Sequence, residues 1–460
     1  MGKTDTIFGL WWVLGKEKEP AQGEVSITED FIVLTVTLFR SLSTLEILRD
    51  HVNSDIEIPP VIHGRNGANE TISLLGCVRK SKTWNSGAII YEVCATAMVK
   101  GLELQSIGEI CLKSCSFNLR YLEDWFGDTG IETKKLDDGQ IAWTLPEPSF
   151  LRYSICEGVT MRIVRMPLSS ATRTTYEFFP SAKVNLIFDQ PKSLQEMFIW
   201  VQNIGRLFSF LMGDDVSPVE FAVTIEDPWA ISTHPHGGQV IRPGKINPPH
   251  ESDADHALRR FSTYDQVAGQ LETILQRWHD LSECLKAVVD LFAAVVFGKE
   301  LPVEVEFLFL AQAVEVYHTK SPRFDSNQLS RDEHASRVDK AVSATPDDVR
   351  EWAKAVLQKA NYKPLKDKLR EVIQSWGAPT LRLYPDIEKA VDRISYNRNH
   401  LTHYSGSGPR LFSDQEMYFA NQSLKALLWT IFLLELGLSG PPIESVFKNL
   451  VFRNVPLSQR

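Results

Sequence analysis

The chain has 460 residues, of which 43% are hydrophobic and 23% are charged. This length is too great for one ordinary core, and the composition is that of a folded protein, so we expect two or three folded domains. The formal net charge of −9 excludes a protein that coats nucleic acid with its whole surface, since such proteins are usually basic, and leaves only a local patch for any such contact.

The first half of the chain predicts β-strands. Segments rich in β-branched residues, with partial alternation of polar and apolar side chains, are bounded by Gly, Asn and Asp. They are residues 23–28, 31–39, 71–78, 88–99, 109–119, 141–145, 158–166, 174–179 and 184–189. The exception is 193–212, where Ser193 can cap a helix whose apolar side chains repeat at helical spacing. Residues 1–230 are therefore expected to form a β-rich region of one or two subdomains.

A segment rich in Pro and Gly, residues 231–257, follows this region and predicts a linker or long loop. Beyond it, apolar periodicity predicts helices at 264–280, 282–297, 303–318, 330–342, 346–360, 363–376, 386–404, 413–437 and 442–450. The fold class that follows is α+β, with a β-rich N-terminal region and an all-α domain over residues 258–460.

The apolar and cysteine-containing segments indicate a cytoplasmic protein without a membrane span. The most apolar run, residues 426–434, is too short to cross a bilayer and predicts a buried helix. The first residues lack a basic segment followed by a long apolar core, so we expect no secretory signal. The six cysteines form no CxxC pair, which favours reduced, mostly buried thiols.

The helix predicted at 386–404 ends in a cluster of hydrogen-bond donors and titratable groups. Its apolar stripe consists of Ile387, Val391, Ile394 and Leu401. Arg398 lies within this stripe, where burial of a guanidinium is costly unless the group is paired with an anion or serves a function. Glu315, on the helix predicted at 303–318, is one candidate partner. His403 follows five residues later, about 140° around an ideal helix, so fraying or a tighter last turn, or a second copy of the helix across a two-fold axis, would be needed to bring it beside Arg398.

An imidazole beside a guanidinium suits metal-free cleavage of RNA. A neutral His403 would remove the proton of a ribose 2′-OH, and Arg398 would stabilise the charge on the phosphoryl oxygens. Asn399 would orient His403 or donate to a phosphate oxygen. Because the 2′-OH is the nucleophile, RNA would be cut and DNA spared, and no metal or cofactor is needed. These residues equally allow a solvated helix end with Arg398 in a salt bridge and the histidines at the negative end of the helix dipole.

A basic stretch precedes the motif helix, and it consists of Lys354, Lys359, Lys363, Lys366, Lys368 and Arg370. It would suit a phosphate backbone, and we take Lys363 and Lys366, together with Arg393, as the predicted substrate-binding residues. The alternative is a solvated face balanced by nearby carboxylates, which are Asp348, Glu351 and Glu371.

A loop metal site is an alternative to consider. Its candidate ligands are His234, His236, His250, Asp253, Asp255 and His256. The residue types suit Zn²⁺, but no tightly spaced pair of ligands stands out and Pro235 separates the first two. We therefore predict no metal.

The run RNHLTH, residues 398–403, resembles the Arg-polar-x-x-x-His motif of HEPN-domain ribonucleases. Residues 307–318 are similar to the helix before that motif in the ApeA branch of HEPN proteins, and 8–15, 118–127 and 191–197 resemble the ApeA N-terminal domain. These segments occur in the expected order over almost the whole chain. In this resemblance Arg398 and His403 take the catalytic positions and Asn399 takes the polar position.

The resemblance implies a bacterial anti-phage protein that stops infection by cleaving host or phage RNA, with tRNA among the candidates. It also implies a homodimer or higher homo-oligomer in which two motifs face each other, and an N-terminal region that senses a phage-derived trigger. Two other functions stay open. One is a catalytically silent HEPN module that mediates assembly. The other is an antitoxin-like partner of a nucleotidyltransferase, which the large N-terminal region argues against.

Overall fold

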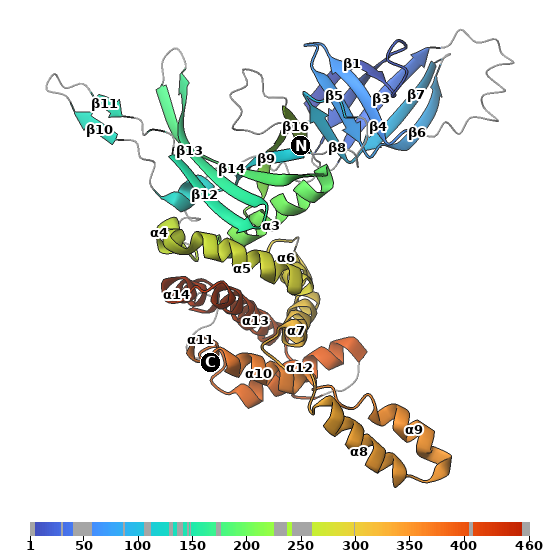
Figure 1. The fold of residues 1–460 in the computed structure, drawn as a ribbon, viewed down its shortest axis with the longest axis vertical. Helices are drawn as coiled ribbons and strands as arrows, with labels where there is room; N and C mark the ends of the chain where they lie inside the picture. The colour runs from blue at the N-terminus through green and yellow to red at the C-terminus, as the bar shows by residue number, and fades with distance from the viewer. Residues whose placement is uncertain are drawn as a thin grey trace. The chain divides into compact units, whose positions relative to one another are not determined.

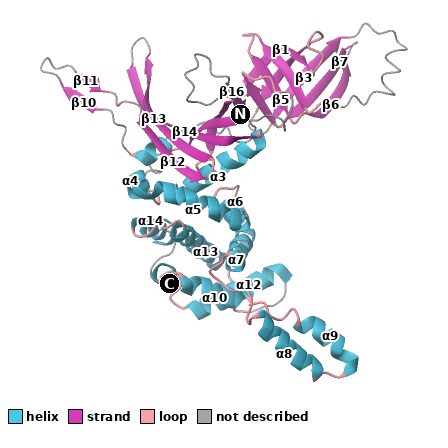
Figure 2. Cartoon of the chain, in the orientation of Figure 1, coloured by secondary structure: helices cyan, strands magenta, loops and turns pink. Residues whose placement is uncertain are grey.

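The computed structural model of the protein describes residues 5–28, 31–39, 58–85, 88–104, 112–127, 132–135, 141–144, 147, 149–171, 176–224, 237–241, 260–298, 300–403 and 408–452. The chain divides into two compact units. The β unit comprises Met1–Ser209, Asp215–Leu258 and Thr263–Asp265, and the helical unit comprises Phe210–Asp214, Arg259–Ser262 and Gln266–Arg460. The predicted α+β class is confirmed, with strands in the first half and helices in the second (Figure 2).

The β unit is built on antiparallel strands (Figure 1). They are β1 (Asp5–Trp12), β2 (Ala21–Ile27), β3 (Ile32–Phe39), β4 (Val61–Asn66), β5 (Thr71–Leu75), β6 (Val78–Asn85), β7 (Ala88–Ala95), β8 (Ala97–Lys100), β9 (Leu112–Leu119), β12 (Ser149–Cys156), β13 (Val159–Ala171), β14 (Tyr176–Lys192), β15 (Pro218–Thr224) and β16 (Gly237–Ile241). Their order in the sheet is β12-β13-β14-β9-β15-β16-β8-β5-β4-β1-β2-β3-β7-β6, and β10 (Glu132–Lys135) pairs separately with β11 (Ile141–Thr144).

Alternation of side chains explains the sheet around β1. Trp11 is almost fully buried, whereas Phe8 and Leu10 of the same strand are exposed on the other face. A Cβ at Gly64 would lie 2.3 Å from the indole of Trp11, so glycine at this position of the neighbouring β4 is what makes room for the ring.

Part of the expected linker is a strand. Residues 231–257 were predicted to be irregular, but Gly237–Ile241 forms β16, which pairs with both β15 and β8. Two neighbouring strands supply hydrogen-bond partners for this backbone, and Val240 is buried, so tertiary pairing overrides the turn-forming character of the two glycines. The candidate zinc ligands lie outside the described residues. Within the described ones, no cluster of three or more His, Cys, Asp or Glu side chains is arranged to hold a metal.

Two helices accompany the strands, α2 (Leu122–Phe126) and α3 (Leu194–Met212). The predicted cap of α3 is confirmed, because the backbone N–H of Glu196 donates to Ser193 Oγ and the Glu196 carboxylate accepts from the backbone N–H of Ser193. The last residues of α3, from Phe210 onward, belong to the helical unit, as do the two residues that follow the helix.

Helix α4 (Tyr264–Val267) begins in residues of the β unit and ends in residues of the helical unit. The helices that follow it in the helical unit are α5 (Leu271–Cys284), α6 (Lys286–Val296), α7 (Val303–Lys320), α8 (Arg331–Ser343), α9 (Asp347–Leu357), α10 (Leu365–Ser375), α11 (Ala378–Leu381), α12 (Ile387–His403), α13 (Asp414–Glu435) and α14 (Pro441–Val446). Short turns of other helix types occur at Ala268–Gln270 and Phe447–Phe452. Capping boxes at Ser330 and Ser413 explain where α8 and α13 begin.

The core of the helical unit surrounds α13, the buried helix that the apolar run 426–434 predicts. The ring of Phe432 stacks on that of Phe292, with centroids 5.6 Å apart, and Phe210 packs against both. Trp429 lies in the same cluster, and its Nε1–H donates to the carbonyl of Phe210 at 3.0 Å, which satisfies its buried polar atom. In the described part of the chain, no helix has the length and hydropathy that crossing a membrane requires.

Candidate functional site

The site is built on α12, whose start and buried face follow from its sequence. Asp386 caps the helix, because its carboxylate accepts the backbone N–H of Lys389 at 3.0 Å. Val391, Ile394 and Asn397 form the buried face, which packs toward α7 and α10. The helix ends at His403.

Arg398 is held by a carboxylate on α7. Its Nη2 donates to Glu315 Oε2 at 3.0 Å and to Gln312 Oε1 at 3.5 Å, and its Nη1 donates to Asn399 Oδ1 at 3.4 Å. The side chains of Arg398 and Glu315 are each 23% exposed, so the ion pair is largely shielded from water. The expectation that a guanidinium within the apolar stripe has a partner, with Glu315 as the candidate, is confirmed.

Glu315 serves a second cation as well. Its Oε1 lies 3.5 Å from Nζ of Lys368, a buried lysine of α10 that also donates to Thr319 Oγ1 at 3.1 Å. The carboxylate of Glu315 therefore lies between two cations from two different helices. This arrangement fixes the position of Arg398 relative to α7 and α10.

His403 is exposed at the last position of α12. Within the part of the chain that the structure describes, no hydrogen bond joins it to Arg398, whose guanidinium bonds to side chains of α7 and of the neighbouring Asn399. This agrees with the separation of about 140° that a five-residue spacing gives on a helix. A single chain therefore presents the two motif side chains in different directions.

Asn397 is a residue of this site to which the sequence analysis assigned no role. Its Nδ2 donates to the carbonyls of Arg393 and Arg410, at 2.8 and 2.9 Å, and its Oδ1 accepts the backbone N–H of Phe412 at 2.8 Å. The side chain is 1% exposed. It thus connects the last turns of α12 to the segment before α13. The sequence does indicate that this amide is buried, because Asn397 continues the three-residue spacing of the apolar Val391 and Ile394.

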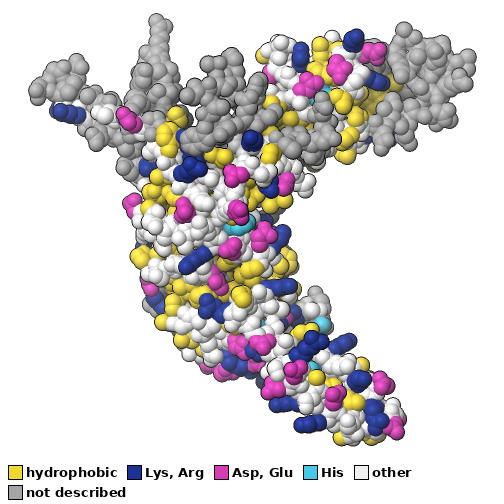
Figure 3. Space-filling model, viewed as in Figure 1, with side chains coloured by type: hydrophobic (Ala, Val, Ile, Leu, Met, Phe, Trp, Pro, Cys, Tyr) yellow, Lys and Arg dark blue, Asp and Glu magenta, His cyan; other side chains and the backbone are white. Residues whose placement is uncertain are grey.

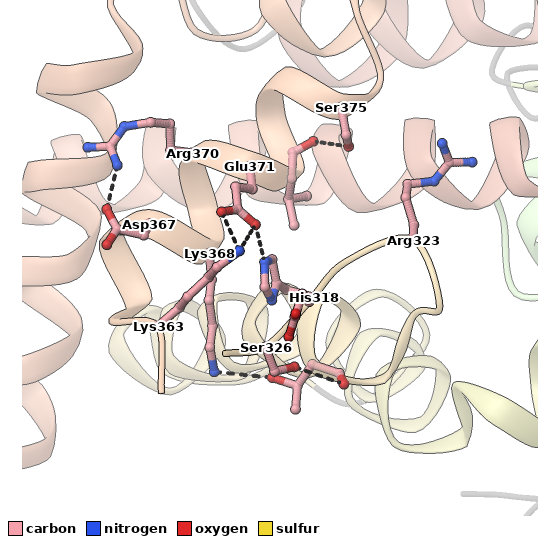
Figure 4. A network of polar contacts seen from close by, with 12 residues as sticks. His318, Arg323, Ser326, Lys363, Asp367, Lys368, Arg370, Glu371 and Ser375 are labelled. Carbon is pink, nitrogen blue, oxygen red and sulfur yellow. Dashed lines mark hydrogen bonds and ion pairs between the residues drawn. The ribbon is translucent and has the colours of Figure 1, made fainter. Parts of the chain in front are cut away.

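A second polar network lies beside the first, between α7 and α10 (Figure 4). Nε2 of the fully buried His318 lies 2.8 Å from Glu371 Oε2, and Nζ of Lys363 donates to both oxygens of that carboxylate at 2.7 and 2.9 Å. The ring of His318 stacks on Phe324, with centroids 4.7 Å apart. The network holds α10 against the last turn of α7.

Burial and charge shift the two titratable groups of this network. Burial lowers the pKa of His318 below its ordinary value, although the hydrogen bond that its ring makes to the Glu371 carboxylate opposes the shift. Burial alone would raise the pKa of Glu371, but its bonds to Lys363 and His318 outweigh this effect and lower it. His318 is therefore neutral and Glu371 ionised near neutral pH.

The three predicted substrate-binding cations are all paired with carboxylates. Lys363 contacts Glu371, as described above, and Lys366 Nζ lies 3.1 Å from Asp392 Oδ1. Arg393 Nη2 lies 2.9 Å from Glu416 Oε1, and its guanidinium stands over the ring of Phe412 at 4.5 Å. Lys366 and Asp392 are both more than a third exposed, so this pair can exchange its partner with little cost.

Residues 6–278 match the family model of the ApeA N-terminal domain 1, and residues 308–440 match that of the Apea-like HEPN domain. The chain belongs to the ApeA family of HEPN proteins. The HEPN match begins within α7 and extends past α13, so it contains Glu315, Arg398 and His403. The two matches identify an anti-phage HEPN protein. No curated protein and no solved structure matches this ApeA-type chain.

Proposed function

We propose that this protein is a metal-independent endoribonuclease of abortive anti-phage defence, with Arg398 and His403 as its catalytic residues. The observation that carries the proposal is the placement of Arg398. It is held on α12 by Glu315 inside the HEPN match, five residues before an exposed histidine at the helix end. A guanidinium has five N–H donors, so Arg398 keeps donors for a phosphate while Glu315 holds one side of the fork.

The proposed reaction is attack by a ribose 2′-oxygen on the adjacent phosphorus. Neutral His403 takes the 2′-OH proton, the oxygen–phosphorus bond forms, and the bond from phosphorus to the 5′-oxygen breaks. Arg398 stabilises the negative charge on the phosphoryl oxygens as it grows. The departing 5′-oxygen takes a proton from an acid or from water, and the products carry a 2′,3′-cyclic phosphate and a 5′-hydroxyl. Asn399, next to Arg398, donates to the phosphate.

A homodimer completes this site in the proposal, because one chain presents Arg398 and His403 in different directions. Lys366 is the predicted substrate-binding residue best placed to release its carboxylate to an RNA phosphate, since its pair with Asp392 is the most exposed of the three. The N-terminal region, which the ApeA model matches separately from the HEPN domain, senses a phage-derived trigger.

The test is cleavage of cellular RNA in EDTA by purified protein, with and without extract from phage-infected cells, and with product ends mapped. We expect 2′,3′-cyclic phosphates from the wild type and none from Arg398→Ala or His403→Ala. His400→Ala is the matched control, because it removes an imidazole from the same helix end outside the motif positions. Equal cleavage by all four proteins, or cleavage that EDTA stops, would disprove the mechanism.

A catalytically silent assembly module is the second candidate. It is favoured by one observation: Arg398, Lys363, Lys366 and Arg393 are each paired with a carboxylate, as in a structural network of charges. The same variants separate the two functions in cells. A silent module tolerates loss of Arg398 or His403, whereas a nuclease loses phage protection while keeping its fold.

A further inference from the structure

Helices α8 and α9 form a hairpin that projects from the other helices of the helical unit (Figure 1). Its base is closed by the side chain of Asn361, which donates to the carbonyl of Leu329 and accepts the backbone N–H of the same residue, both at 2.9 Å. Beside it, the N–H of Gln328 donates to the carbonyl of Asn361, and that of Lys363 donates to the carbonyl of Ser326. Lys363 also binds Glu371 of α10, and α10 packs against α12, so the hairpin is fixed to the neighbour of the helix that carries the motif.

Helix α9 of this hairpin carries an apolar stripe that the described part of the chain leaves exposed. Val349, Trp352 and Val356 are 40%, 70% and 48% exposed, and none of the residues of α9 is buried. Spacings of three and four residues put these side chains on one face of the helix. Large apolar side chains gathered on one exposed face mark an interaction surface more often than single ones do.

The charge of the hairpin argues against RNA as the occupant of this stripe. Residues 331–359 carry six basic and six acidic side chains, and Figure 3 shows both kinds close together over the hairpin. Binding to a nucleic acid backbone depends on an excess of positive charge. A balanced pattern around an apolar stripe is instead typical of a helix that packs against another helix.

The positions of two charged side chains along α9 indicate which partner fits this stripe. Asp348 and Lys359 are exposed, are eleven residues apart, and have no ion-pair partner within the described residues. Lys359 follows the last residue of α9, Leu357, by two positions, and the intervening Gln358 keeps helical backbone angles. Eleven residues along this path make three helical turns to within about 20°, which puts both charges on the same flank of the stripe, one at each end. In an antiparallel pair of helices related by a two-fold axis, the same flanks of both helices meet. Asp348 of one copy then lies beside Lys359 of the other.

We propose that α9 is a self-association surface, on which the stripe centred at Trp352 packs antiparallel against the same stripe of a second copy of this chain. The inference rests on the proposed function in one respect, since a paired HEPN site needs two chains. A helix of eleven residues is about 16 Å long, so this contact alone is below the size of a stable interface. We therefore expect the α9 contact to act together with other contacts between the two chains, and to contribute to a dimer that dissociates reversibly.

The test is the dimerisation constant of the full-length protein, measured by sedimentation over a range of concentrations. Trp352→Ala is expected to weaken association by about tenfold or more. Tyr418→Ala, which removes an aromatic side chain of 43% exposure from α13, is the control and leaves association unchanged. A wild type that stays monomeric, or a Trp352→Ala protein that associates as the wild type does, overturns the proposal.

A charge swap distinguishes this geometry from any other. Asp348→Lys and Lys359→Asp each put like charges opposite one another and weaken association, and the doubly swapped protein regains it. Without recovery in the double variant, the antiparallel self-contact is wrong. Loss of RNA binding with unchanged association would show that the stripe binds RNA, which also overturns the proposal. Because association is measured without cleavage, an absence of nuclease activity counts against the proposed function and leaves this result intact.

Discussion

The stability of the helical unit is expected to depend on Glu315 far more than on an ordinary surface glutamate. This carboxylate accepts from Arg398 at 3.0 Å and lies 3.5 Å from Nζ of Lys368, and the three side chains are 23%, 23% and 9% exposed. Glu315→Ala leaves two cations facing each other with no anion between them. Both then remain partly desolvated without compensation.

The magnitude lies between two measured limits. Exposed ion pairs contribute about 0.2–1 kcal/mol, and removal of one partner from a fully buried pair costs about 3–5 kcal/mol. Glu315 is shielded but not fully buried, so we expect Glu315→Ala to lower the free energy of unfolding by about 2–3 kcal/mol. For a unit of this size, 1 kcal/mol corresponds to roughly 2–4 °C, so the melting temperature should fall by about 4–12 °C.

Scanning calorimetry of the full chain, with Glu304→Ala as the matched control, measures this effect. Glu304 is an exposed glutamate in the first turn of the same helix, and its loss should cost less than about 1 kcal/mol. Combining Glu315→Ala with Arg398→Ala tests the pair directly, since contacting charges should be coupled by at least about 1 kcal/mol. If the two changes add to within about 0.5 kcal/mol, or if Glu315→Ala costs no more than Glu304→Ala, the reasoning is refuted.

Two further predictions concern the same helices. Asn397→Ala removes three part-buried hydrogen bonds that a buried side chain makes to the backbone, and it should lower the free energy of unfolding by about 2–4 kcal/mol. Asn399→Ala, at an exposed position, should cost less than about 0.5 kcal/mol, and chemical denaturation compares the two variants. His318 has a pKa lowered by burial, so the unfolded chain binds a proton more readily, and stability should fall as the pH drops below about 7, through 6.5. His318→Gln should flatten this slope, and an unchanged slope would assign it to another group.

The helices could be predicted closely from the sequence because their signals are local. The pattern predicted helices at 330–342 and 413–437, and the structure has them at Arg331–Ser343 and Asp414–Glu435, each started by a capping box within four residues. Strands depend on partners that are distant in the chain. β16 pairs with β8, more than a hundred residues earlier, and nothing within Gly237–Ile241 indicates that pairing.

The same difference between local and distant signals explains why the role of Arg398 was predicted and that of Asn397 was not. The need of Arg398 for a partner followed from its place in an apolar stripe, which is a local property of one helix. The role of Asn397 did not, because its partners Arg410 and Phe412 come from beyond the end of that helix, and only the folded chain returns them to it. Short-range periodicity shows where a polar group is buried, but it does not show which distant backbone group it meets.

The direction of the two motif side chains links the fold to the proposed oligomer. Arg398 points to α7, where Glu315 holds it, and His403 stands exposed at the end of α12, so the two side chains leave the helix in different directions. A second chain avoids this conflict, because it can supply an exposed imidazole to a guanidinium that stays in place. In the proposed nuclease, Glu315 would then have a task beyond stability, since it would keep Arg398 oriented while the other half of the site comes from a second copy.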